Sequence, residues 1–325
     1  MISCTASAPG KCILVGEHAV VYGTKAIVTA LNLRAYTSIE IIPDKKIDIE
    51  AMDYQLHKEF PYIAEIKLDK KLVPLKPIVK CCQMMINKFK LNKGMKLRIW
   101  SEIPPSAGLG SSAAVFVATV KAIETAFDLN LTNDEISQMA FDVEKIVHTK
   151  PSGIDNFICT HGGCIQYSKS EEIKRVELPK NFPLIICNSE KPRNTGILVE
   201  KVAKLHKNFP RITKKIFDAI NLLSMNALES LKKGDLVKLG EIFNLNQGLL
   251  EALGVSTSLL SQFINIAREK GAYGAKLTGA GGGGCIIAIS PPAKQINIIS
   301  ALKKIGGVPI LTEFAKDGVK VEKLK

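Results

Sequence analysis

The sequence of 325 residues has no apolar stretch long enough to span a membrane. The longest, residues 113–120, falls well short of the roughly 18 residues that a membrane helix needs. The N-terminus also lacks a basic region followed by a hydrophobic segment, the pattern of a secretory signal peptide. We therefore expect a soluble protein that is made and kept in the cytoplasm.

Closely paired cysteines are missing as well. The eight cysteines are scattered along the chain, and no two of them form a C-x-x-C pair. In a cytosolic protein such cysteines are expected to be reduced and mostly buried as small apolar side chains. The sequence therefore predicts neither a disulfide framework nor a zinc site.

Aromatic residues are few, with a single Trp, and acidic residues are outnumbered by Lys and Arg, 31 to 44. The resulting net charge of +13 permits binding to nucleic acid. The lysines are nevertheless spread along the whole chain and are not interleaved with aromatic side chains that stack on bases. An enzyme that acts on anionic small molecules explains the positive charge equally well, so the charge alone leaves both classes open.

The chain is 46% hydrophobic and long enough for one large or two medium domains. Strands are predicted where β-branched residues cluster: 3–8, 13–15, 36–42, 96–101, 163–167, 184–188 and 285–290. Helices are predicted at 111–127, at 132–147 and over most of 194–270. Strands followed by helices, instead of strict alternation, favour an α+β fold over a doubly wound parallel sheet. We place a domain boundary near residue 180, which gives domains 1–180 and 181–325.

The strongest local signal is P-P-S-A-G-L-G-S-S-A-A, between a predicted strand and a predicted buried helix. It consists of Pro104, Pro105, Ser106, Ala107, Gly108, Leu109, Gly110, Ser111, Ser112, Ala113 and Ala114. Gly108 and Gly110 permit positive φ angles and the close approach of a ligand, so successive N–H groups and the positive helix end can bind a phosphate. The spacing is neither the Walker nor the Rossmann pattern. An ordinary tight connection between strand and helix is the alternative.

A second glycine cluster occupies residues 279–284, where five of six residues are glycine. So many glycines lose considerable chain entropy on folding, which a plain loop rarely requires. The cluster is predicted to pack against the first loop or against a phosphate. A flexible hinge is the alternative.

Two carboxylates lie close together in the sequence. Glu144 precedes His148 by one helical turn, and Asp155 is expected to lie in a turn shaped by Pro151 and Gly153. One carboxylate can bind a divalent ion while the other accepts a proton from a hydroxyl. A solvated helix face is an equal alternative for Glu144, and His148 is interpreted as structural.

Lys11 follows Pro9-Gly10, read as a turn, in an otherwise apolar strand. A lysine buried there without a partner is costly, so Lys11 is expected to pair with an anion, either Asp155 or a substrate phosphate. A solvated strand edge is the alternative.

Together these segments resemble the GHMP kinases, in the same order and spacing and over nearly the whole chain. They are S-A-P-G-K ending at Lys11, P-P-S-A-G-L-G-S-S-A-A, P-S-G-I-D ending at Asp155 and K-L-T-G-A-G-G-G-G from Lys276. Residues 11–23, K-C-I-L-V-G-E-H-A-V-V-Y-G, and 191–195, K-P-R-N-T, resemble the mevalonate kinase branch of that family. The G-E-H-T-D continuation of galactokinases is absent, and homoserine kinases lack the aspartate that Asp155 supplies.

The resemblance implies the two-domain GHMP kinase architecture. Its N-terminal domain is like that of ribosomal protein S5, its C-terminal domain is ferredoxin-like, and the active site lies between them. It further implies that the phosphates of ATP bind at 108–112, supported by the loop 279–284. Ser112 and Glu144 correspond to the ligands of Mg²⁺, since both supply hard oxygen donors.

For the second substrate, the resemblance implies that Asp155 accepts the proton of the reacting hydroxyl or orients it. Lys11 pairs with Asp155 and stabilises the developing alkoxide. Arg193 has the planar fork that suits a carboxylate. The expected contacts to the substrate hydroxyls are Glu17, His18 and Thr195.

The expected function is the ATP-dependent phosphorylation of the 5-hydroxyl of mevalonate in isoprenoid synthesis, with no nucleic-acid or membrane partner. Members of this family often form homodimers, although no stretch of this sequence proves an interface. Another GHMP kinase, such as a phosphomevalonate kinase, is one alternative, disfavoured by the matches at 17–18 and 193–195. A non-catalytic nucleotide- or nucleic-acid-binding protein is another, disfavoured because Lys11, Glu144 and Asp155 are all present.

Overall fold

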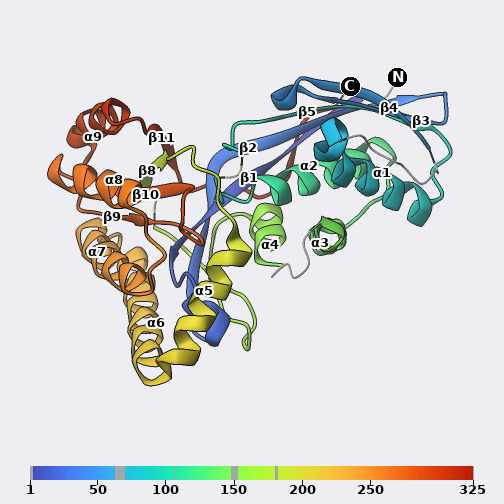
Figure 1. Ribbon diagram of the computed structural model, residues 1–325. Helices are drawn as coiled ribbons and strands as arrows, with labels where there is room; N and C mark the ends of the chain where they lie inside the picture. The colour runs from blue at the N-terminus through green and yellow to red at the C-terminus, as the bar shows by residue number, and fades with distance from the viewer. Residues whose placement is uncertain (1–2, 63–69, 106, 148–152, 180–181, 325) are drawn as a thin grey trace.

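The structure, a computed structural model, describes residues 3–62, 70–105, 107–147, 153–179 and 182–324. Two β-sheets organise these residues, and each carries its own group of helices (Figure 1). The buried apolar side chains form two clusters, one mainly around the first sheet and one around the second. Within the described part of the chain, no helix combines the length and the apolar character that crossing a membrane requires.

The first sheet has eight strands in the order β12-β1-β2-β5-β3-β4, with β6 paired to β2 and β7 to β6. They are β1 Ser3–Val15, β2 Ala26–Ile42, β3 Lys46–Ala51, β4 Leu56–Pro61, β5 Gly94–Ser101, β6 Cys164–Tyr167, β7 Lys174–Val176 and β12 Lys320–Leu324. Its helices are α1 Lys76–Phe89, α2 Ser111–Ala126, α3 Asn133–Val147 and α4 Ile154–His161. They gather on one face of the sheet (Figure 1), where α2 packs against β1 and β2. Helix α2 is apolar on nearly every side, and most of its residues are buried, as the sequence predicts.

The second sheet is antiparallel, in the order β11-β8-β10-β9. Its strands are β8 Pro183–Asn188, β9 Gly274–Leu277, β10 Cys285–Ile289 and β11 Val308–Glu313. The helices of this half are α5 Thr195–Asn208, α6 Pro210–Lys233, α7 Leu236–Ala252, α8 Ser258–Glu269 and α9 Pro292–Lys304. Short 3₁₀ helices are η1 Ala19–Tyr22, η2 Met52–Tyr54 and η3 Lys70–Leu75. Helices α7 and α8 pack against β9, and α9 packs against α8.

Local sequence signals explain where several helices begin and end. The capping box before α3 is confirmed, because Glu135 accepts from the backbone N–H of Thr132 at 2.8 Å and Thr132 accepts from that of Glu135 at 3.3 Å. Helix α6 ends at Gly234, whose φ is +70°. Asp235 then starts α7 by accepting from the backbone N–H of Lys238 at 2.9 Å. The predicted helical region 194–270 therefore consists of four helices, α5 to α8.

Two local predictions are wrong. Pro9-Gly10 is not a turn: the predicted strands 3–8 and 13–15 are one strand, β1, whose register against β2 shifts between Pro9 and Gly10. This shift in register is a β-bulge, which accommodates Pro9 without ending the strand. Asp155 does not lie in an irregular turn either, because α4 begins directly after Gly153 and carries Asp155 in its first turn. Gly153, with φ of +77°, is the residue that precedes this helix.

The C-terminal strand β12 pairs antiparallel with β1, so both ends of the chain meet in the first sheet (Figure 1). Arg34 supports this return: its guanidinium donates to the carbonyl oxygens of Ser7 at 3.0 Å and of Gly318 at 2.6 Å. The α+β prediction is confirmed by the two mainly antiparallel sheets with helices packed on them. The domain boundary near residue 180 stays a prediction. Strand β8, which follows residue 180, belongs to the second sheet, whereas β12 at the end of the chain belongs to the first.

Candidate active site

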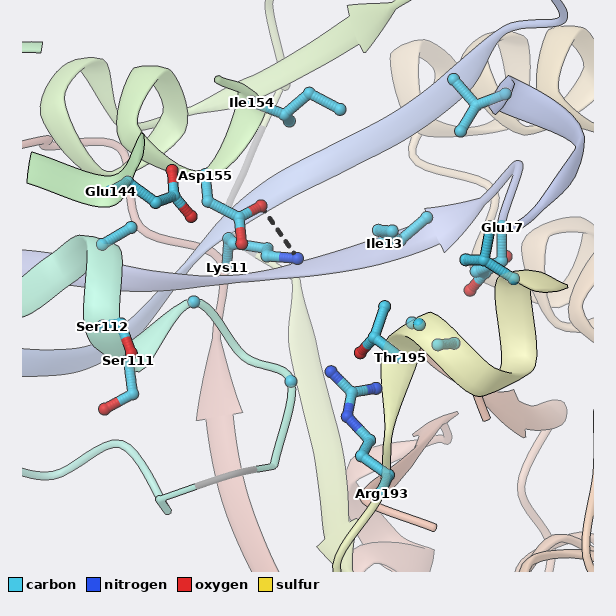
Figure 2. A pocket seen from close by; sticks show the side chains of 18 of the residues that line it. Lys11, Ile13, Glu17, Ser111, Ser112, Glu144, Ile154, Asp155, Arg193 and Thr195 are labelled. Carbon is cyan, nitrogen blue, oxygen red and sulfur yellow. Dashed lines mark ion pairs between the residues drawn. The ribbon is translucent and has the colours of Figure 1, made fainter. Parts of the chain in front are cut away.

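A cavity of about 890 Å³ lies between the elements of the two sheets (Figure 2). Its walls are built by β1 and the turn after it, the loop before α2, the starts of α4 and α5, and the glycine loop 279–284. The predicted site residues that line it are Lys11, Glu17, His18, Pro105, Gly108, Gly110, Ser111, Ser112, Ala113, Glu144, Asp155, Arg193 and Thr195. Ala107, Leu109 and Ala114 are buried behind this wall. Ser106 and His148 lie outside the described residues.

Lys11 and Asp155 form an ion pair near the middle of the cavity (Figure 2), with 3.0 Å between Nζ and Oδ1. Lys11 comes from β1 just after the bulge and is 7% exposed, so its charge needs a partner. Asp155 stands in the first turn of α4, where the helix dipole favours a carboxylate. The predicted pairing of Lys11 with an acidic group is therefore present in the structure.

The loop before α2 has the geometry of an anion site. Gly108 and Gly110 have φ angles of +81° and +75°. Gly110 is the N-cap residue of α2, so no side chain at that position accepts a hydrogen bond from the first N–H groups of the helix. The first backbone N–H groups of α2 are thus open to a ligand. The backbone N–H of Lys11 donates to the carbonyl of Leu109 at 2.8 Å, which ties this loop to the strand that carries the ion pair.

Arg193 lies in the segment between β8 and α5 and reaches back toward that loop (Figure 2). A Cβ atom on Gly108 would overlap its guanidinium, and one on Gly279 would crowd it at 2.7 Å from Nη1. Glycine at these two positions therefore makes room for the arginine. Its Nη1 is buried without a hydrogen-bond partner among the described residues, and burial lowers the pKa of its guanidinium. The site thus presents a cation with an unused donor between its two glycine-rich loops.

Glu144 points into the same cavity from α3 and is 8% exposed. Burial, together with the neighbouring carboxylate of Asp155, raises the pKa of Glu144 to about 7. The buried side chain of Asn156 donates to its Oε2 at 2.5 Å. Sequence reasoning assigned nothing to Asn156, although a polar residue directly after Asp155 in an apolar segment is a signal that could have found it.

The residues present suit a bound Mg²⁺. Ser112 and Glu144 contribute a hydroxyl and a carboxylate to the wall of the cavity, and both are hard oxygen donors. In the described part of the chain, no three His, Cys, Asp or Glu side chains form a metal cluster by themselves. Mg²⁺ does not require one, because it is commonly held by one or two carboxylates together with substrate phosphates.

The turn after β1 forms the opposite end of the cavity from Ser111 and Ser112 (Figure 2). His18 has a φ of +60°, and its Nε2 lies 2.9 Å from the carbonyl oxygen of Ala280. Both carboxylate oxygens of Glu17 are engaged: Lys276 is ion-paired with one, and Asn246 donates to the other at 3.1 Å. Neither Lys276 nor Asn246 was predicted as part of the site.

A second cavity of about 340 Å³ adjoins the first and shares Tyr54, Pro105, Ser111 and Ser112 with it. Its remaining walls are largely apolar and include Pro74, Ile78, Ile99 and Phe116. A site that holds phosphates beside an apolar pocket suits a nucleotide, whose base is flat and weakly polar.

Comparisons with known proteins agree with this geometry. The family GHMP kinases N terminal domain matches residues 76–163, and GHMP kinases C terminal matches residues 227–307. Mevalonate kinase from Thermococcus sibiricus is 38% identical and that from Pyrococcus abyssi 37%, each over 98% of both chains. Among solved structures, Methanococcus jannaschii mevalonate kinase has a TM-score of 0.87 and 28% identity, covering 95% of this chain and 98% of that one. The L. major mevalonate kinase in complex with R-mevalonate has a TM-score of 0.84 and 28% identity, covering 95% of this chain and 94% of that one.

Proposed function

Since the chain belongs to the mevalonate kinase family of the GHMP kinases, we propose that it transfers the γ-phosphoryl group of ATP to the 5-hydroxyl of mevalonate. The products are 5-phosphomevalonate and ADP. The observation that carries the proposal is the Lys11–Asp155 ion pair, which stands in the cavity beside an open helix N-terminus. An acceptor hydroxyl and a terminal phosphate can therefore meet there.

ATP is proposed to bind with its phosphates on the loop 108–112 and its base in the adjoining apolar cavity. The open N–H groups of α2 and the helix dipole support the first part. The shared residues Ser111 and Ser112 support the second, because they join the two cavities. Ser112 and Glu144 would hold Mg²⁺, which when bound neutralises charge on the phosphates.

The chemical step is proposed to use few residues. Asp155 accepts the proton of the 5-hydroxyl or orients it, and the hydroxyl oxygen forms a bond to the γ-phosphorus while the bond to the β-phosphate oxygen breaks. The ammonium of Lys11, held 3.0 Å from Asp155, stabilises the negative charge on the attacking oxygen and the transferring group.

The remaining part of mevalonate carries a carboxylate and a second hydroxyl. We assign the carboxylate to Arg193, whose buried Nη1 lacks a partner in the described residues. The guanidinium also lies against Gly108 of the phosphate loop, so contact with the transferring phosphoryl group is the competing role. Thr195, which is exposed to the cavity, and His18 are assigned to the hydroxyl.

Both substrates are soluble metabolites, so the proposed place of action is the cytoplasm. A homodimer remains a prediction from the family resemblance.

The direct test measures ADP release with mevalonate, phosphomevalonate and galactose side by side, at equal concentrations and with MgATP in excess. Release that depends on mevalonate is expected, with the other two near the background rate. Faster release with phosphomevalonate or galactose would contradict the assignment of the substrate.

A further inference from the structure

A completely buried ion pair joins the two halves of the molecule at the wall of the cavity. Lys276 on β9 and Glu17, in the turn after β1, have side chains with 0% exposure and are bound to each other. They are 259 residues apart in the sequence. Buried charges are expensive unless they are paired and hydrogen-bonded, so a pair in this place requires an explanation.

Further hydrogen bonds hold both members of the pair. Asn246 on α7 donates to Glu17 at 3.1 Å, and Lys276 also donates to the carbonyl oxygen of Leu277 at 2.6 Å. Glu17 lines the cavity, and each of its carboxylate oxygens already has a partner in the protein. Glu17 nevertheless brings a negative charge to the wall of the cavity, and the ammonium of Lys276 neutralises that charge.

Alternate residues from Lys276, near the end of β9, to Ala280 all contact the end of β1 or the turn after it. Lys276 binds Glu17, Thr278 donates to the carbonyl oxygen of Ile13 at 2.9 Å, and the carbonyl of Ala280 meets His18 at 2.9 Å. The backbone N–H of Ile13 also donates to Thr278 at 3.2 Å. This segment therefore fixes both the glycine loop and the turn 17–18 against the strand that carries Lys11.

We propose that Lys276 is a positioning residue for the acidic substrate: by neutralising Glu17 and holding residues 17–18 in place, it makes this end of the cavity acceptable to a carboxylate. The inference rests on the proposed function and deepens it. In Figure 2, Ser111 and Ser112 lie at one end, Glu17 at the other, and the Lys11–Asp155 pair between them. Arg193, to which we assign the carboxylate, lies against Gly279, and the carbonyl of the next residue, Ala280, meets His18. A short acid whose hydroxyl sits at Asp155 and whose carboxylate binds Arg193 therefore lies on the side of the cavity that Glu17 and His18 close.

Without Lys276, the negative charge of Glu17 would have no cation to cancel it and would disfavour a carboxylate in the same cavity. The structure therefore ties the role of Lys276 to the charge of Glu17. Lys276→Met is expected to raise KM for mevalonate by about tenfold or more, with KM for MgATP changed by less than about threefold. In the Glu17→Gln background there is no charge to cancel, so the same substitution should then raise KM for mevalonate by less than about threefold.

The experiment measures kcat and both KM values for the wild type, Lys276→Met, Glu17→Gln and the double variant. Lys238→Met is the matched control, because it removes a lysine from an exposed ion pair with Glu241 on α7. The wild type alone tests the proposed function: failure to phosphorylate mevalonate would refute that function. The inference is tested by the ratio of KM for mevalonate between each variant that carries Lys276→Met and the same protein without it.

Two results would overturn the inference. One is a KM for mevalonate that stays at the wild-type value in Lys276→Met, with only the melting temperature reduced, as expected for a purely structural lysine. The other is a KM penalty of the same size in the Glu17→Gln background. If Lys276→Met does not fold, the double variant compared with Glu17→Gln decides the question, because replacing both charges leaves none buried without a partner.

Discussion

Replacing Glu144 by Gln is predicted to make the free protein more stable at pH 8 while it weakens the use of MgATP. The pKa of Glu144 is about 7 in the folded protein, against 4.5 for an unperturbed carboxyl. The folded state therefore holds a proton that the unfolded state has lost between these two values, and stability falls as the pH rises through them. One pKa unit corresponds to about 1.4 kcal/mol, so the ionised side chain costs the free protein up to about 3 kcal/mol above pH 7.

The amide introduced by Glu144→Gln can still accept the hydrogen bond from Asn156 but carries no charge in that buried site. The assay is urea unfolding of wild type and Glu144→Gln at pH 5 and pH 8, without nucleotide or Mg²⁺. The gain in unfolding free energy should be large at pH 8 and small at pH 5. Glu135→Gln is the control on the same helix: the hydrogen bonds from Thr132 lower the pKa of Glu135, so losing this carboxylate should destabilise the protein to a similar extent at pH 5 and pH 8. A Glu144→Gln variant that is no more stable than wild type at pH 8 would refute the reasoning.

Three further substitutions test the rest of the site. Ser112→Ala should raise the Mg²⁺ concentration needed for half-maximal velocity, since it removes an oxygen ligand; an unchanged Mg²⁺ titration would remove Ser112 from the metal site. Arg193→Ala should raise KM for mevalonate tens-fold, the roughly 2–3 kcal/mol of a charge-assisted contact, with KM for ATP nearly constant. A fall in kcat at constant KM would instead assign Arg193 to the transferring phosphoryl group. Gly108→Ala should reduce activity, because its Cβ would displace that guanidinium at a φ of +81°, and a fully active variant would contradict this packing.

Features that depend on neighbouring residues could be predicted from the sequence. The capping box at Thr132 and the apolar surface of α2 are local patterns, and both are found in the structure. Gly108 and Gly110 also predicted that the N-terminus of α2 is open to a ligand. Lys11 could be predicted to need an anion because an apolar strand does not tolerate a lone charge.

Features that depend on distant contacts could not be predicted in this way. Strand β12 consists of exposed residues with three lysines or glutamates among five, and it becomes a strand only by pairing with β1. The Glu17–Lys276 pair joins residues 259 positions apart, so neither residue signals the other. Helix α4 was missed because Pro151 and Gly153 indicate a break, and a break is compatible with a loop or with a new helix.

The central claim is that Asp155, paired with Lys11, acts on the hydroxyl of mevalonate. The most direct test is the steady-state kcat of Asp155→Asn with saturating mevalonate and MgATP, on protein whose circular dichroism and melting temperature match those of the wild type. We predict a fall in kcat of about 10² or more with smaller changes in either KM, the scale of a lost proton acceptor and electrostatic partner. A folded Asp155→Asn variant that retains most of its turnover would contradict the account.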